Sequence, residues 1–160
     1  PTPVVIGNGG RTIPTSVISN DQASNNVENA GTVFDPAQDG IDFYESLEGM
    51  LVQVNDALVV GPKNSFGEIW VLADNGANAT GRTARGGTLI SSGDFNPERI
   101  QIDDDSGVLT GFASPTVNVG AHLSDVTGVV TYDFGNYQVV PTQAYTVTQP
   151  ATIANATEAR

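Results

Sequence analysis

Three consecutive aspartates are the first residues of this chain that could do chemistry. Asp103, Asp104 and Asp105 precede Ser106 and Gly107, so they offer carboxylate oxygens within a turn. Ca²⁺ takes about six to eight oxygen ligands of this kind, and the three aspartates are therefore a candidate calcium site. The chain lacks the glutamate that an EF-hand carries at about the twelfth loop position. An acidic β-turn without a metal is the alternative.

A second group of residues combines aromatic rings with positive charge. Rings that stack on bases and cations that contact phosphates together make an interface for single-stranded nucleic acid. Four of the six basic residues fall between positions 63 and 99, where a bound strand would lie on the predicted fold. The alternative is that Trp70 and Tyr132 belong to the core, while the other rings anchor loops and the arginines neutralise nearby acids. The candidate nucleic-acid-binding residues are Lys63, Phe66, Trp70, Arg82, Arg85, Arg99, Phe134 and Tyr137.

The sequence offers little for catalysis. It has no cysteine and a single histidine, His122, so thiolate chemistry is excluded. The one histidine lies in a Gly- and Ala-rich loop, and the sequence shows no serine–histidine–acid arrangement around it. We therefore expect His122 to be structural or solvent-exposed, and we expect the chain to be non-catalytic.

Composition points to a single acidic domain built mainly from strands. Charged residues make up 15% of the 160 residues, and glycine occurs 18 times, which favours short strands joined by tight turns. The chain carries 18 acidic and 6 basic residues, for a net charge of −12. Such a surface repels a phosphate backbone on average, and it suits an extracellular or salty setting. No apolar run approaches the ~18 residues of a membrane span, so we expect no membrane contact.

These candidate residues must be positioned by a small number of strands. The longest apolar run is 48–60, in which Met50, Val52 and Val54 alternate with more polar residues before a continuous apolar stretch. Alternation predicts a strand with one buried face, and a strand this long is expected to bend and serve two parts of a sheet. A capping box over Asp42 and Glu45 predicts one short helix before it, and the i,i+4 spacing of Phe43 and Leu47 predicts that both side chains enter the core. The other predicted core strands are 66–73, 99–102, 126–132 and 137–140.

The number and order of the strands predict an all-β fold. Five strands arranged as a meander, a long excursion and a hairpin fit a small five-stranded OB-like Greek-key barrel, with a β-sandwich as the alternative. OB folds bind ligands on the face of their second and third strands, between two flanking loops. We expect one domain over residues 1–148, with an N-terminal arm at 1–40 and the barrel core at 41–148. Residues 149–160 are predicted to form a linker.

Four segments resemble a known family. Residues 9–18 (GGRTIPTSVI), 42–60 (DFYESLEGMLVQVNDALVV), 93–104 (GDFNPERIQIDD) and 123–143 (LSDVTGVVTYDFGNYQVVPTQ) look like the OB-like region of large secreted bacterial nucleases. In that family the region precedes a catalytic domain of the endonuclease/exonuclease/phosphatase type. One departure is residues 106–123, whose glycines and Pro115 cannot sustain the helix that OB folds place between their third and fourth strands.

The resemblance implies that this chain is an accessory part of a metal-dependent extracellular DNase. The catalytic domain would be a neighbour in the same protein, and the signal peptide would lie outside this segment. On this interpretation the module binds single-stranded DNA or presents it to the catalytic domain. A structural spacer without a ligand is one alternative. A Ca²⁺-dependent module that binds an extracellular polymer is the other.

Overall fold

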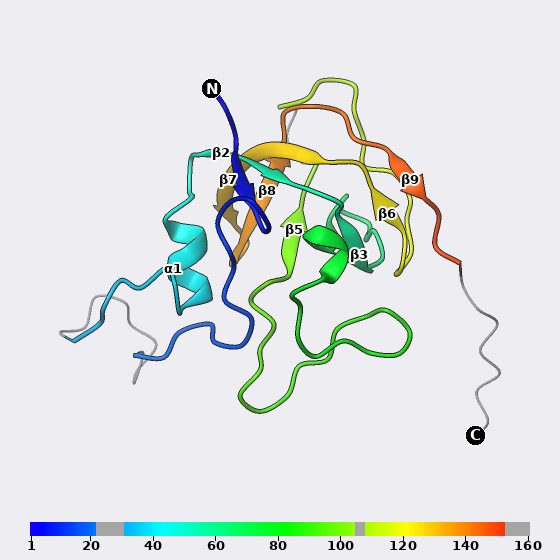
Figure 1. The fold of residues 1–160 in the computed structure, drawn as a ribbon. Coiled ribbons are helices and arrows are strands. Elements are labelled where there is room, and N and C mark those ends of the chain that lie inside the picture. The colour runs from blue at the N-terminus through cyan, green and yellow to red at the C-terminus, as the bar shows by residue number, and fades with distance from the viewer. Residues whose placement is uncertain (22–30, 105–107, 153–160) are drawn as a thin grey trace.

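A computed structural model describes residues 1–21, 31–104 and 108–152, and these residues form one mixed β-sheet of nine strands (Figure 1). The strand order is β1-β2-β7-β8-β5-β4-β3-β6-β9, and the all-β prediction is confirmed. The predicted alternative, a sandwich of two sheets, is not what the described residues form. The elements are β1 (Val4–Ile6), α1 (Gly40–Glu45), β2 (Leu51–Val54), β3 (Leu58–Gly61), β4 (Ile69–Leu72), η1 (Asp74–Gly76), β5 (Ile100–Ile102), β6 (His122–Leu123), β7 (Val126–Asp133), β8 (Asn136–Pro141) and β9 (Val147–Gln149).

The long apolar run forms two strands instead of one. It breaks between β2 and β3, where Asp56 has a φ of +44°. The carbonyls of Asn55 and Asp56 accept hydrogen bonds from the backbone N–H groups of Asp74 (2.9 Å) and Asn75 (2.8 Å). β2 then pairs with β7, while β3 pairs with β4 and β6. The same run therefore serves both parts of the sheet, as predicted, and the sheet curls into a barrel-like shape (Figure 1).

The remaining predicted strands lie where the pattern placed them. The predicted ranges 66–73, 99–102, 126–132 and 137–140 correspond to β4, β5, β7 and β8, with ends shifted by a few residues. β7 and β8 form the predicted hairpin, and β8 runs parallel to β5. β6 and β9 were not among the predicted core strands. β9 ends at Gln149, the first residue of the predicted linker, and residues 153–160 of that linker lie outside the described part.

The core follows the predicted burial pattern. Val52 and Val54 are fully buried, and Ala57 to Val60 are buried throughout, as expected for a segment covered on both sides. Met50, in contrast, is 41% exposed, because it precedes β2 and the alternation starts only with that strand. Burying each large apolar side chain stabilises the fold by roughly 1.5–3 kcal/mol. The facing residues come from β4, β5, β7 and β8, and include Ile69, Val71, Ile100, Ile102, Val130 and Val139.

The N-terminal arm and the short helix complete the core. α1 buries Phe43, and Leu47 just beyond it is also buried, which confirms that part of the helix prediction. The predicted cap is wrong. The helix begins at Gly40 after Asp39, and the Asp42 carboxylate instead accepts the backbone N–H of Asp35 at 2.6 Å. Ile6 and Ile13 of the arm join the same core. The described residues between β5 and β6 contain no helix, as predicted.

Gly128 in β7 allows the hairpin to pack closely. A Cβ atom at this position would lie 2.3 Å from the backbone oxygen of Val140, which is too close for real atoms. We therefore predict that Gly128→Ala lowers the free energy of unfolding by at least about 1–3 kcal/mol, measured by urea denaturation. Gly87→Ala is the matched control, because its Cβ would meet only the Thr83 hydroxyl at 3.4 Å. Equal effects from the two substitutions would contradict the close approach.

Candidate ligand-binding grooves

The fold brings several of the predicted aromatic residues close together. Trp70 of β4 pairs in register with Gln101 of β5, and Gln101 pairs with Gln138 of β8. On the hairpin, Tyr132 of β7 lies directly opposite Tyr137 of β8. Side chains at paired positions point to the same face of a sheet. Tyr137 and Gln138 are neighbours on one strand, so the two tyrosines point to the opposite face of the sheet from Trp70. Trp70 and the tyrosines nevertheless line one groove together.

We call this first groove the central groove. It has a volume of about 220 Å³. Its rings contact one another: Tyr137 stacks on Tyr44 with centroids 5.9 Å apart, and Tyr132 lies 4.9 Å from Tyr137. Aromatic contacts of this kind hold the rings in place, and Tyr132 remains 55% exposed. The lining includes Tyr44, Trp70, Arg99, Tyr132, Asn136 and Tyr137.

Tyr44 and Arg99 fix the floor of the central groove. Tyr44 is buried, and its hydroxyl donates to the backbone oxygen of Pro97 at 3.0 Å. Burial, and secondarily the charge of Glu98, raises the pKa of Tyr44 far above its ordinary value, so the hydroxyl keeps its proton. The Arg99 guanidinium lies 4.7 Å from the centre of the Trp70 ring, a cation–π contact. Arg99 is therefore a positive charge held over an aromatic ring.

A second groove, the phenylalanine groove, adjoins the first at Asn136. It has a volume of about 450 Å³, and Phe66 and Phe134 are among its lining residues. Phe66 is 78% exposed and Phe134 is 90% exposed, so neither ring packs into the core. The remaining lining residues are polar or acidic: Asn64, Glu68, Asp103 and Asn136.

Two tight turns present these phenylalanines. The Asn64 side-chain oxygen accepts the backbone N–H groups of Phe66 (2.9 Å) and Glu68 (3.1 Å), which closes a turn and directs the Phe66 ring outward. Phe134 and Gly135 form the loop of the β7–β8 hairpin, with φ values of +46° and +82°. Such positive angles match a type I′ turn, in which asparagine usually precedes glycine. A phenylalanine at this position is strained.

We predict that replacing the strained ring stabilises the chain. Phe134→Asn should raise the free energy of unfolding by about 0.5–1 kcal/mol, because asparagine tolerates positive φ and the ring buries little surface. Thermal or urea unfolding would measure the change. Phe66→Asn is the control, since Phe66 is equally exposed but does not have a positive φ. A loss of stability in Phe134→Asn would show that the ring packs against the fold.

The other predicted basic residues do not join either groove. The Lys63 ammonium donates to the backbone oxygen of Ser114 at 2.6 Å. Arg82 donates to the backbone oxygen of Gly86 at 3.2 Å, and Arg85 is exposed on the same connection. The structure thus brings Trp70, Arg99 and Tyr137 together, places the two phenylalanines in the adjoining groove, and leaves Lys63, Arg82 and Arg85 apart from both.

Tyr44 is a groove residue that the sequence analysis missed. It follows the predicted core residue Phe43 on α1, and the helix pattern gave no reason to place it beside the hairpin. The Phe43 and Tyr44 rings meet edge to face at 5.3 Å, so one ring fills the core while the other lines the groove. Adjacent aromatic residues on a short amphipathic helix are the only signal that pointed to it.

The three aspartates of the candidate calcium site have separate surroundings. Asp103 lines the phenylalanine groove. Asp104 accepts the backbone N–H of Ser114 and lies against Gly67, and Asp105 falls outside the described residues. Within residues 1–21, 31–104 and 108–152, no group of three or more His, Cys, Asp or Glu side chains is arranged to hold a metal ion. Calcium binding by Asp103, Asp104 and Asp105 stays a prediction.

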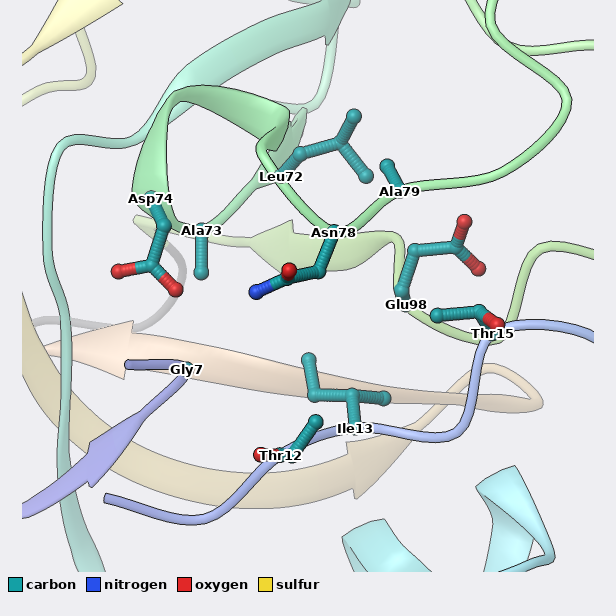
Figure 2. Close-up of a pocket in the computed structure, with 10 residues that line it drawn as sticks. All are labelled: Gly7, Thr12, Ile13, Thr15, Leu72, Ala73, Asp74, Asn78, Ala79 and Glu98. Carbon is teal, nitrogen blue, oxygen red and sulfur yellow. The ribbon is translucent and has the colours of Figure 1, made fainter. Parts of the chain in front are cut away.

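A smaller cavity lies between the N-terminal arm and η1 (Figure 2). Its volume is about 30 Å³, which is room for about two water molecules and too little for an aromatic ligand. Asp74 lies at one end and Glu98 at the other, beside Thr15 (Figure 2). One Glu98 carboxylate oxygen accepts the backbone N–H of Thr80 at 2.9 Å, and the Thr80 hydroxyl donates to the Thr15 carbonyl at 2.9 Å. Glu98, two residues before β5, is therefore linked through Thr80 to Thr15 of the arm.

The buried carboxyl of Glu98 makes the stability of the fold depend on pH. It is 5% exposed, and its second carboxylate oxygen is buried without a hydrogen-bond partner in the described structure. Burial raises the pKa of Glu98, although the hydrogen bond from Thr80 opposes the shift. The folded state therefore holds the proton more tightly than the unfolded state does. Stability should fall as the pH rises from the ordinary glutamate pKa through the raised one.

We predict that Glu98→Gln removes this pH dependence. The free energy of unfolding of the variant, relative to the unsubstituted chain, should increase as the pH rises from about 4 to about 8. Urea unfolding at a series of pH values would measure it. Glutamine keeps an acceptor for the Thr80 N–H, so the comparison isolates the charge. A difference that does not change with pH would contradict the buried, proton-binding carboxyl.

Two further features bear on function. His122 lies in β6, half-buried, and pairs with Leu58 and Gln149. No helix in the part of the chain that the structure describes has the length and apolar character needed to cross a membrane.

Comparisons with known proteins place the grooves within a family domain. A family model described as "Domain of unknown function (DUF8508)" matches residues 5–151. The chain matches no curated protein and no solved structure. The matched range runs from β1 to just beyond β9, so both grooves belong to the family domain.

Proposed function

This chain belongs to the DUF8508 family, and we propose that it is a non-catalytic, OB-like module of a secreted metal-dependent nuclease. In this proposal the module holds single-stranded nucleic acid in the central groove and presents it to a separate catalytic domain. The resemblance of four segments, in order, to the OB-like region of such nucleases supports the parent enzyme. One histidine and no cysteine in the sequence fit a module that leaves the chemistry to its neighbour.

The order of strand pairing supports the OB-like part of the proposal. Starting from the run 51–61, β3 pairs antiparallel with β4, and β4 with β5. β5 pairs parallel with β8, β8 antiparallel with β7, and β7 antiparallel with β2. This path returns to the run where it started, as in a five-stranded barrel of the OB type. β1, β6 and β9 would then be additions to that barrel.

The position of the central groove fits the same interpretation. OB folds bind nucleic acid on their second and third strands, between the loop after the first strand and the hairpin of the last two. In this chain those strands are β4 and β5. Trp70 lies on β4, and Arg99 directly precedes β5. The flanking loops are the Phe66 turn and the β7–β8 hairpin. The observation that carries the proposal is the Arg99–Trp70 pair beside three packed tyrosines in one groove.

Stacking, rather than charge, should supply the affinity. A base stacked on an aromatic side chain contributes about 1–3 kcal/mol, with little dependence on sequence. Arg99 is the one basic residue that lines the central groove among the described residues, and the chain as a whole carries a charge of −12. Few phosphates can therefore be neutralised. Each contacted phosphate of a single strand contributes a slope of about −0.7 to the dependence of log K on log salt.

We predict measurable but weakly salt-dependent binding of a single-stranded oligonucleotide. The fluorescence of Trp70, the only tryptophan, should be quenched on titration at low salt. The slope of log K against log salt should be about −0.7, shallower than that of basic OB grooves, because about one phosphate is contacted. Trp70→Ala, followed by anisotropy of a labelled oligonucleotide, should lose about 1–3 kcal/mol of binding free energy.

Arg82→Ala provides the matched control for Arg99→Ala. Both remove one positive charge, but only Arg99 lines the groove. Arg99→Ala should weaken binding, whereas Arg82→Ala should change it only slightly. Equal effects would mean that net charge, not the groove, governs binding. Absence of binding at low salt would favour the structural spacer. Binding that requires added Ca²⁺ would favour the calcium-dependent module.

A further inference from the structure

The phenylalanine groove has a different chemical character from the central groove. Its two rings are Phe66 and Phe134, which are among the most exposed large apolar side chains of the described residues. Exposed rings grouped around one hollow mark a binding surface more often than isolated ones do. The groove lies beside the proposed nucleic-acid site but shares only Asn136 with it.

The polar lining of this groove is acidic. Glu68 and Asp103 line it, together with Asn64 and Asn136, and no basic residue is among its described lining residues. Asp104 adds a third carboxylate close by, against Gly67 in the Phe66 turn. Carboxylates at this density repel a phosphate group. The groove therefore suits a cation and does not suit the backbone of a nucleic acid.

Rings and carboxylates together select one kind of cation. A guanidinium stacks flat on aromatic faces and donates two parallel hydrogen bonds to a carboxylate. An ammonium group can approach a ring, but it is more strongly hydrated and lacks the flat fork. We propose that the phenylalanine groove receives an arginine side chain of a partner protein. The guanidinium lies against Phe66 or Phe134 and donates to Glu68.

The groove is prepared for such a ligand before it binds. The Asn64 side chain accepts the N–H groups of Phe66 and Glu68, and its amide donates to the Glu68 carboxylate. The two-residue hairpin loop fixes Phe134, and the Asn136 amide donates to the Phe134 carbonyl at 3.4 Å. Rings held by tight turns lose little conformational entropy on binding. The exposed Phe134 ring is presented from a backbone position with a strained, positive φ.

The test uses the full 160-residue chain labelled with ¹³C at its phenylalanine rings. The probes are three short, uncharged-end peptides of Gly and Ser that carry two arginines, two lysines or two citrullines. Citrulline keeps the shape of arginine but lacks its charge. We expect the ring signals of Phe66 and Phe134 to shift with the arginine peptide, less with lysine, and not with citrulline. Phe66→Leu and Phe134→Leu should each weaken arginine binding about two- to fivefold.

Matched variants separate the groove from general attraction to an acidic protein. Glu68→Gln should weaken arginine binding, whereas Glu45→Gln, on an exposed residue that lines neither groove, should not. Leu89→Ala, which removes an exposed apolar side chain elsewhere, should also leave binding unchanged. Equal binding of the arginine and citrulline peptides would overturn the proposal. So would equal losses from Glu68→Gln and Glu45→Gln, or ring shifts that a single-stranded oligonucleotide produces and the arginine peptide does not.

Discussion

The fold depends on the break between β2 and β3. A straight strand through residues 51–61 could pair with only one neighbour on each side, and the sheet would stay open. Asp56 bends the chain at a φ of +44°, and η1 holds the bend through backbone hydrogen bonds from Asp74 and Asn75. Both of those residues also have positive φ. Asp and Asn tolerate positive φ better than most other residues, so the three residues at this junction are of types that suit its backbone conformation.

The same junction anchors the N-terminal arm. The Asp74 carboxylate accepts the backbone N–H of Asn8 at 2.7 Å, and Glu98 ties Thr80, and through it Thr15, to the sheet. The arm therefore closes over one end of the core with its own apolar residues, Ile6 and Ile13. That end lacks a helix in the described residues between β5 and β6. β5 is buried along its whole length, and the two grooves lie at its ends, beside Arg99 and Asp103.

Sequence patterns predicted the strands better than the site. Alternation in 48–60 and the Gly-containing turn at 133–136 depend on local steric rules, so the strands and hairpin could be located within a few residues. The break at Asp56 could not, because aspartate permits positive φ without requiring it. The helix cap failed for a similar reason: Asp42 and Glu45 have the spacing of a capping box, but a tertiary contact with Asp35 takes the Asp42 carboxylate. Trp70, Arg99 and Tyr137 could be grouped from strand order, whereas Tyr44 depends on how α1 packs.

The two grooves are lined by residues of opposite charge, and residue types alone do not reveal this. Counting rings and cations between positions 63 and 137 suggests one continuous basic, aromatic surface. In the fold, Lys63, Arg82 and Arg85 bond to or lie on other segments, and among the described residues Arg99 is the one cation that lines the central groove. The acids Glu68 and Asp103 fall on the other side of Asn136. Because Coulomb interactions act over about 10 Å at ordinary salt, neighbouring grooves can attract opposite ligands. A module that holds an anionic polymer in one groove and a basic partner in the next could bridge the two, even though its net charge alone would favour only the second.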